Sequence, residues 1–156
     1  MAPTVSKPGN SAVTAVYGGS LRVDVQDLMY ISSGSTAQPA SSIAAGANEA
    51  ADQATLAAAF LGLAQERKLA TDVAGYVEVD TEPAEILYPC VSGTYNIGDY
   101  VGGTRDGGAA LVRGKVTAAA AQAGRIGVVT RYAPAGSTQV WVRFFSNKVP
   151  GYNRLS

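Results

Sequence analysis

A short pattern that occurs twice in the chain is the sequence feature that most constrains its fold. The clearer copy consists of GDYV at 98–101, RIGVV at 125–129 and VWVRF at 140–144. The fainter copy consists of DLMY at 27–30, FLGLA at 60–64 and YVEVD at 76–80. Each copy predicts a turn into a strand, then a buried strand centred on glycine, and then a strand that alternates between apolar and polar residues. The repetition therefore predicts two similar β-rich halves.

The chain of 156 residues is long enough for one domain or two small fused halves, and it can bury a core without a metal ion or a disulfide. We expect a mainly β (α+β) fold with one or two short helices, built on a small β-barrel or β-sandwich core. Its β-rich body is predicted over residues 21–145, with pseudo-repeats at 21–82 and 91–145. Proline and glycine in residues 1–20 predict an extended N-terminal arm outside the core, and residues 146–156 are predicted to form a C-terminal tail.

One helix is predicted over residues 48–59, which are rich in alanine, the best helix former. Asn48 is a suitable N-cap, and the carboxylates of Glu49 and Asp52 suit the positive end of the helix dipole. Periodicity and turn-forming residues assign the remaining segments: strands at 21–25, 28–31, 85–91 and 109–113, loops at 32–42 and 133–138, and one or two helical turns at 117–123.

Charge is divided between the two halves of the chain. Residues 1–90 carry four basic and ten acidic side chains, a net charge of −6, whereas residues 91–156 carry eight basic and two acidic ones, a net charge of +6. The halves are expected to attract each other, either within one chain, which we favour, or between neighbouring copies. No stretch combines a basic run with interleaved aromatic residues, so the sequence argues against a nucleic-acid partner.

Catalytic and metal chemistry lacks its usual residues in this sequence. There is no histidine, which removes the common general base and metal ligand, and the single cysteine, Cys90, has no partner for an internal disulfide. The apolar neighbours of Cys90 predict a buried, inert thiol. The acidic cluster at 78–85 is explained by the solvated face of a strand rather than by a pair of glycoside-hydrolysing acids. We therefore expect no catalytic residues, no cofactor and no metal site, and a protein that is not an enzyme.

Targeting signals are also missing from the sequence. The first residues do not show a charged segment followed by an apolar one, which favours folding in the cytoplasm. The longest apolar runs are far shorter than the roughly 20 residues that a membrane-spanning helix needs, so no membrane partner is expected.

The repeated motifs resemble those of a known family. GDYV at 98–101, the alanine-rich segment that follows, RIGVV at 125–129 and VWVRF at 140–144 are similar to the capsid decoration (cement) proteins of tailed phages. In that family a GD-hydrophobic-V turn, an IGVV or FVGVA strand and a final V-x-V strand recur in small β-barrel-like domains. The resemblance covers about residues 21–145. The first copy departs from it, because no glycine precedes Asp27 and the helix at 48–59 is longer than the motif requires.

The resemblance implies a structural virion protein that binds the outer surface of an assembled phage capsid. Such a protein bridges neighbouring major capsid subunits, often as a homotrimer at threefold positions, so its partners are the major capsid protein and copies of itself. Apolar side chains in the predicted arm and tail are the candidate contacts: Val5, Val13, Val16, Tyr17, Tyr152 and Leu155. Two alternatives stay open, a tail or adaptor component of the particle and a small carbohydrate- or ligand-binding β-barrel.

Overall fold

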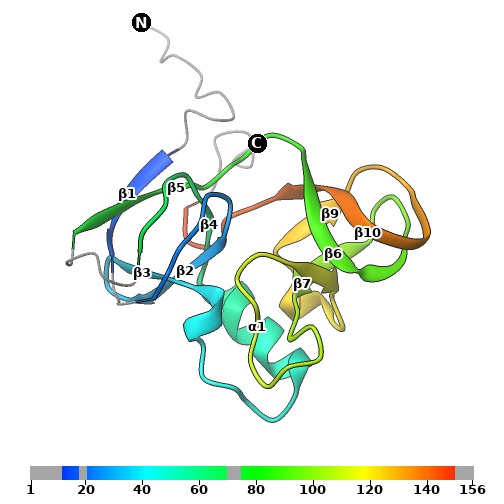
Figure 1. The fold of residues 1–156 in the computed structure, drawn as a ribbon, viewed down its shortest axis with the longest axis horizontal. Helices are drawn as coiled ribbons and strands as arrows, with labels where there is room; N and C mark the ends of the chain where they lie inside the picture. Colours follow the sequence, from blue (N-terminus) through cyan, green and yellow to red (C-terminus); the bar gives the residue numbers. More distant parts are fainter. Residues whose placement is uncertain (1–11, 18–20, 70–74, 150–156) are drawn as a thin grey trace, which may run out of the picture.

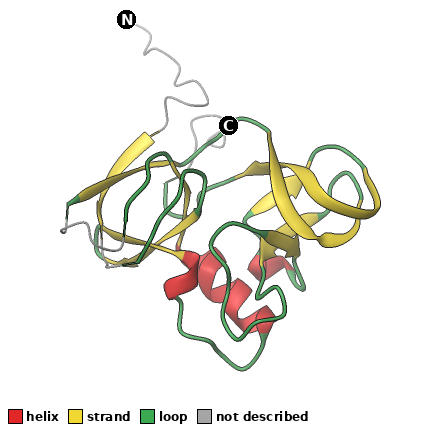
Figure 2. Ribbon diagram, viewed as in Figure 1, coloured by secondary structure: helices red, strands yellow, loops and turns green. Residues whose placement is uncertain are grey.

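The computed structural model describes residues 12–17, 21–69 and 75–149. In this part of the chain, ten strands form two closed five-stranded barrels that lie next to each other (Figure 1). The helical segments gather on one side of the two barrels (Figure 2). The predictions of a mainly β fold, a small barrel core and two pseudo-repeated halves are confirmed.

The two barrels have the same topology. The strands of barrel 1 are β1 (Ala12–Tyr17), β2 (Leu28–Ser33), β3 (Thr36–Pro39), β4 (Phe60–Ala64) and β5 (Tyr76–Asp80). The strands of barrel 2 are β6 (Ile86–Tyr95), β7 (Tyr100–Gly103), β8 (Val116–Ala118), β9 (Gly127–Val129) and β10 (Ala133–Phe144). In each barrel the first strand pairs in parallel with the third, the other pairs are antiparallel, and the fifth strand closes against the first.

Strand register extends this equivalence to single buried residues. Ala64 pairs with Val79 in barrel 1, and Val129 pairs with Val142 at the same place in barrel 2. The buried cluster of barrel 1 consists of Ala15, Tyr17, Val23, Met29, Ala37, Leu61, Ala64, Val77 and Val79. Their counterparts in barrel 2 are, in the same order, Tyr88, Cys90, Tyr95, Val101, Val116, Ile126, Val129, Val140 and Val142. The interior of each barrel is thus filled by side chains at matching positions.

The glycine of each buried strand is required by the close approach of the fifth strand. A Cβ atom on Gly62 would lie 2.1 Å from the backbone oxygen of Asp80. A Cβ atom on Gly127 would lie 2.7 Å from Cγ1 of Val142. Because real Cβ atoms do not come this close to other heavy atoms, the glycine in both copies of the motif serves the packing of the barrel.

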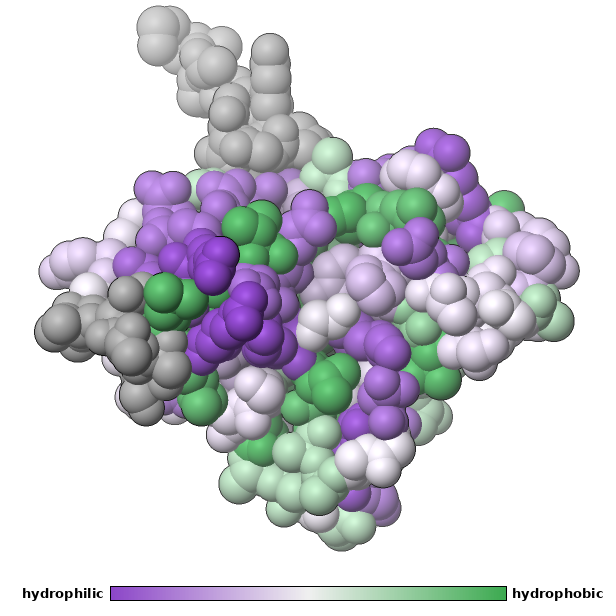
Figure 3. Space-filling view, viewed as in Figure 1, coloured by the Kyte–Doolittle hydropathy of each residue, from purple (hydrophilic) through white to green (hydrophobic). Residues whose placement is uncertain are grey.

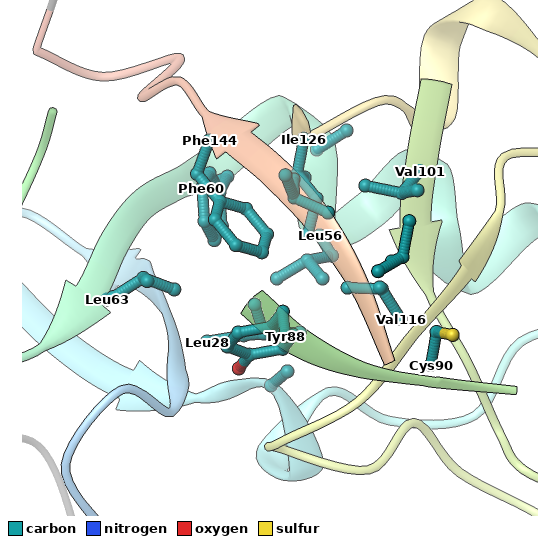
Figure 4. Packing of buried hydrophobic residues seen from close by; sticks show 14 of the residues in the cluster. Leu28, Leu56, Phe60, Leu63, Tyr88, Cys90, Val101, Val116, Ile126 and Phe144 are labelled. Atoms are coloured by element: carbon teal, nitrogen blue, oxygen red, sulfur yellow. The ribbon is translucent and has the colours of Figure 1, made fainter. Parts of the chain in front are cut away.

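The side of barrel 1 packs against barrel 2. The core of barrel 2 continues into apolar residues on the outer side of β2 and β4, and these include Leu28 and Phe60 (Figure 4). The Phe144 ring lies 6.2 Å from the Phe60 ring and meets the Tyr88 ring edge-on at 4.9 Å, both between centroids. Tyr88 donates a hydrogen bond from its hydroxyl to the Gln26 carbonyl oxygen in barrel 1. These aromatic contacts join the outer side of barrel 1 to the core of barrel 2, while the interior of barrel 1 forms a separate cluster.

The predicted helix is α1 (Glu49–Ala59), and its prediction is confirmed. Asn48 Oδ1 accepts a hydrogen bond from the Ala51 amide at 2.9 Å, which caps the first turn. The helix joins β3 to β4, whereas the equivalent connection in barrel 2 holds only the short η2 (Gln122–Gly124). The buried Gln53 side chain fastens α1 to barrel 2, donating to the Gly103 carbonyl at 2.8 Å and accepting from the Ala120 amide at 3.0 Å.

Opposite charges meet between the two halves of the chain. Arg113 forms ion pairs with Asp24 and Asp27, and Arg105 pairs with Asp52 of α1 at 2.8 Å. The predicted attraction between the halves within one chain is therefore confirmed for these pairs. Burial raises the pKa of the Asp27 carboxyl, although its backbone and Arg113 hydrogen bonds act in the opposite direction.

The predicted N-terminal arm is wrong for residues 12–17. These residues form β1, which pairs with both β3 and β5 and closes barrel 1. Polar and apolar residues alternate only weakly over residues 12–17, so the pattern did not indicate a strand. The segment becomes β1 because strands on both sides satisfy the hydrogen-bonding groups of its backbone. Residues 1–11 and 18–20 of the predicted arm lie outside the described residues. In the predicted tail, Val149 packs against the barrel 1 cluster, and residues 150–156 lie outside the described part.

Several local predictions are also corrected. Residues 21–25 contain only an isolated bridge at Val23, the loop predicted at 32–42 contains β3 and η1 (Ala40–Ser42), and no strand forms at 109–113. Residues 117–123 contribute to β8 and η2 instead of a regular helix, and the loop predicted at 133–138 belongs to the long, irregular β10. The strands that form where loops or helical turns were predicted share one cause, because closing a five-stranded barrel recruits segments whose own composition favours turns.

Candidate binding surfaces

The predicted contact residues fall into different environments. Three of them lie outside the described residues: Val5, Tyr152 and Leu155. Val13 is half-buried against the core of barrel 1, and Val16 is 40% exposed on the outward side of β1. Tyr17 is a correction, because its ring fills the barrel interior and its hydroxyl donates to the Leu21 carbonyl oxygen. Its side chain is therefore part of the core and is not presented to a partner.

The aspartate of each repeated motif holds a tight turn. In barrel 2 the Asp99 amide donates to the Asn96 carbonyl at 3.0 Å, and Asp99 Oδ2 accepts from the Asn96 amide at 2.8 Å. In barrel 1 the Asp27 amide donates to the Asp24 carbonyl at 3.1 Å, and Asp27 Oδ2 accepts from the Asp24 amide at 2.7 Å. The two turns therefore use the same two hydrogen bonds, which is the physical basis of the repeated motif.

Both turns expose an apolar side chain. The third residue has a positive φ in each case, 92° at Gly98 and 73° at Gln26, so Gln26 adopts the conformation that glycine adopts in the second copy. The second residue is exposed in each case, Ile97 by 70% and Val25 by 57%. We refer to Val25 and Ile97 as the turn pair. Each barrel thus presents one aliphatic side chain to solvent from an equivalent, rigid turn.

Barrel 1 carries a second exposed surface on the outward side of β1 and β5. Val16 lies directly opposite Tyr76, which is 66% exposed, and Glu78 follows two residues later on the same side of β5. We call Val16, Tyr76 and Glu78 the acidic patch.

Barrel 2 carries an equivalent surface with the opposite charge. Leu87 of β6 lies directly opposite Trp141 of β10, and Arg143 follows two residues later. The guanidinium of Arg131 stacks over the Trp141 ring, 4.3 Å from its centroid. We call Leu87, Trp141, Arg131 and Arg143 the basic patch. Within the part of the chain that the structure describes, neither Glu78 nor Arg143 forms a salt bridge.

The matching faces of the two barrels differ in charge, and the two patches on them are offset from each other by two residues along the strands. By strand register, Arg143 occupies the position that Asp80 occupies in barrel 1. Arg131 follows β9 at the position that Glu66 takes after β4. Asp80 is only 8% exposed, so the exposed charges of these two strands are Glu78 on β5 and Arg143 on β10.

Glu85 fixes the position of Arg131 in the basic patch. Its carboxylate accepts hydrogen bonds from the Thr130 hydroxyl and from Arg131, the latter at 3.0 Å. These two hydrogen bonds, the Thr130 bond first, lower the pKa of Glu85. Arg131 is therefore held between an anion and an aromatic ring and keeps its stacked orientation.

Reactive groups are not assembled at either patch. Cys90 is buried as predicted, its Sγ lies 3.6 Å from the Ser137 carbonyl oxygen, and burial raises the pKa of its thiol. Among the described residues, no group of three or more histidine, cysteine, aspartate or glutamate side chains is placed to hold a metal ion. In the same residues, no helix is both long enough and apolar enough to cross a membrane.

One cavity of about 330 Å³ lies where barrel 1 meets the connection to barrel 2. Leu63 of β4 and Ile86 of β6 contribute its apolar walls, and Asp80 contributes a carboxylate that accepts from the Glu82 amide at 3.0 Å. Its volume is at the lower end of the range for small-molecule pockets, roughly 300–1,000 Å³.

The exposed residues of these surfaces were partly visible in the sequence. Alternation in YVEVD places Tyr76 and Glu78 on the face opposite the buried valines. The exposure of Val25 and Ile97 was missed, because an apolar residue next to a strand is normally assigned to the core. The sequence signal for them is their position two residues before each motif aspartate, which places them at the outer corner of a tight turn.

The fold and these surfaces define a tandem-barrel protein that exposes apolar and charged surfaces and keeps both barrel interiors filled. Comparison of the sequence with protein-family models and with curated proteins finds no match. A function for the chain is therefore inferred from its own residues and from the motif resemblance.

Proposed function

We propose that this chain is a structural virion protein that binds the outer surface of an assembled phage capsid and stabilises the contacts between major capsid subunits. Its partners are the major capsid protein and other copies of itself, with a homotrimer as the arrangement that the resemblance favours. It is made in the host cytoplasm and resides on the surface of the virion. Its role requires no catalytic group, cofactor or metal ion.

The structural roles of the shared motifs support this proposal. The GD turn, the glycine-centred strand and the V-x-V strand are the elements that build barrel 2, and their counterparts build barrel 1. The resemblance to decoration proteins therefore rests on residues that determine a fold, and the fold agrees with the small barrel-like domains of that family.

The turn pair is the observation that carries the proposal. Val25 and Ile97 are exposed at equivalent, hydrogen-bonded turns, one on each barrel. Burying one such aliphatic side chain is worth about 1–2 kcal/mol, which is weak for a single contact. On a capsid lattice the same contacts recur many times, and repetition converts modest affinities into firm attachment. Figure 3 agrees with this picture, because apolar residues on the visible face form small separate groups between hydrophilic ones.

Co-sedimentation with expanded capsids tests the proposal. We expect the full chain to co-sediment, and the double variant Val25→Ser/Ile97→Ser to lose most of this binding while it keeps its melting temperature. The matched control is Val25→Ile/Ile97→Val, which keeps two apolar side chains at the turns and should keep binding. Electron microscopy of the native particle should show repeating density on the outer shell. A single ring of density at the tail would contradict capsid decoration and support the tail or adaptor alternative.

A small-ligand-binding role is the second candidate, and the cavity beside Leu63 and Ile86 favours it. The barrel interiors are filled, so a ligand would bind between the barrels rather than inside one. Glycan-array binding by the isolated protein, lost in Ile86→Trp and accompanied by failure to bind capsids, would support this candidate over decoration.

A further inference from the structure

We propose that copies of this chain contact each other head to tail, with the acidic patch on barrel 1 of one copy seated against the basic patch on barrel 2 of the next. The proposal names a surface on each barrel and a second copy of the chain as its partner. It concerns the isolated protein and holds whether or not the chain binds capsids.

The apolar centres of the two patches have the same layout. Each is a cross-strand pair of one aliphatic and one aromatic residue on the outward side of the first and fifth strands: Val16 with Tyr76, and Leu87 with Trp141. Exposure of Tyr76 reaches 66% and that of Leu87 reaches 41%, so both pairs offer apolar area for burial. Tyrosine, tryptophan and arginine are enriched among the residues that dominate protein–protein contacts.

The charged residues next to the two apolar pairs have opposite signs. Glu78 follows Tyr76 by two residues and shares its side of β5, and Arg143 follows Trp141 by two residues and shares its side of β10. A copy that lays β5 along β10 in the same direction brings aromatic against aromatic and Glu78 close to Arg143. Two acidic patches would repel each other, as would two basic ones, so the charges select the head-to-tail pairing.

The intramolecular contact between the barrels leaves both patches available. That contact uses the outer side of β2 and β4 in barrel 1, together with Tyr88 and Phe144 of barrel 2. The patches lie instead on the β1–β5 and β6–β10 sides, and in Figure 1 these strands are on the opposite side of the molecule from α1. Because the two patches differ, their contact is heterologous and builds a closed ring or an open chain of copies.

Sedimentation of the purified full chain tests the charges. We expect self-association at about 0.3 mM protein that weakens as salt is raised from about 50 to 500 mM. Glu78→Arg and Arg143→Glu should each weaken it about tenfold, because each sets like charges against each other. An equimolar mixture of the two variants should recover association, since the basic barrel 1 of one then faces the acidic barrel 2 of the other. Ala58→Arg, at an exposed position in the last turn of α1, is the control and should change nothing.

Two outcomes overturn the proposal: a wild-type chain that stays monomeric, or variants whose mixture does not associate better than either variant alone. Because all of these positions are exposed, equal melting temperatures would show that folding is not the cause of a loss.

The apolar centre is tested separately with Tyr76→Ser, which should weaken self-association about tenfold. Ile97→Ser removes an equally exposed apolar side chain outside both patches and should leave it unchanged. If Ile97→Ser and Tyr76→Ser have equal effects, the contact is nonspecific and the proposal fails. A protein that associates as expected but does not bind capsids contradicts capsid binding and leaves this inference standing. A chain that stays monomeric in solution but binds capsids contradicts this inference and leaves capsid binding standing.

Discussion

The two barrels share their strand order, their hydrogen-bonded turn and the positions of nine buried residues, but they differ in how those positions are filled. Barrel 1 places Ala15 and Tyr17 on its first strand where barrel 2 places Tyr88 and Cys90. The large side chain has moved by one inward position along the strand. Topology is therefore maintained by apolar character and total volume, while the distribution of volume is free to change.

This redistribution accounts for the asymmetry of the molecule. The Tyr88 ring extends to Phe144, and its hydroxyl reaches Gln26 of barrel 1. Barrel 1 has the small Ala15 at the equivalent position, and its core stays confined to its own interior. The long α1 adds to the difference, because it leaves barrel 1 and packs on barrel 2. Two similar barrels are joined by an interface to which each contributes different residues.

Removing the first strand of barrel 1 should have the largest effect. β1 lies between β3 and β5 and contributes Ala15 and Tyr17 to the core. Deletion of residues 2–17 removes β1, so β3 and β5 lose their shared partner strand and the core loses both side chains. We expect barrel 1 to unfold, seen as loss of dispersed amide resonances for β2 to β5. Deletion of residues 2–11 keeps β1 and is the control. Retention of the wild-type melting temperature after the longer deletion would show that β1 is dispensable.

Alanine substitution at Gly62 and at Gly127 should show which barrel tolerates an added methyl group less well. At Gly62 the new methyl group would collide with backbone oxygen, which cannot move aside, so we expect a loss of about 3–5 kcal/mol in the free energy of unfolding. At Gly127 the nearest atom belongs to the Val142 side chain, and we expect about 1–3 kcal/mol. Urea denaturation measures both. Equal losses would mean that the two strand pairs relax equally well.

Exchange of the third turn residue between the barrels should change stability in opposite directions. Gln26 has a side chain at a φ of 73°, so Gln26→Gly should gain about 0.5 kcal/mol. Gly98→Gln places a side chain at a φ of 92° and should lose about 1 kcal/mol, although no atom lies within 4 Å of the added Cβ. Thermal unfolding of the two variants provides the measurement. Effects of the same sign would show that contacts, rather than backbone strain, determine these positions.

Acidification should affect barrel 2 through Glu85, which has Ala12 as its counterpart in barrel 1. Hydrogen bonds from Thr130 and then Arg131 lower the pKa of Glu85 below its ordinary 4.5 in the folded chain. The contribution of these hydrogen bonds to stability is therefore present above the unfolded pKa of about 4.5 and is lost in the acidic range below that value, as pH falls through the folded pKa. Glu85→Gln should flatten the fall of melting temperature over this range, and Thr130→Val should reproduce part of the change. An unaltered slope in both variants would exclude this group.

The residue pattern predicted the elements whose own sequence favours a single secondary structure. The strands β4 and β5 and the helix α1 were predicted almost to the residue, since FLGLA, YVEVD and the capped alanine run each favour one structure. Short segments such as β3 and β8 were not predicted, because they become strands only where neighbouring strands offer hydrogen-bond partners.

The binding surfaces were also predictable only in part. Alternation in the fifth strands indicated the outward position of Tyr76, and the sequence showed the opposite charges of the two halves. It did not show that Arg113 and Arg105 pair with acids from the first half of the chain, nor that Arg143 forms no salt bridge among the described residues. Tyr17 was predicted as a surface contact and is buried, because pairing of β1 on both sides turns its ring inward.

By itself, the sequence determined that the chain is built from a duplicated β pattern, because a glycine-centred strand and an aspartate-locked turn are local devices that act within a few residues. It also determined that the chain has no histidine and a single cysteine. Only the tertiary structure decided that each copy closes into a barrel, that barrel 1 packs its side against barrel 2, and that equivalent faces of opposite charge stay exposed. These outcomes depend on contacts between residues far apart in the chain, whose energies appear only once both barrels have formed.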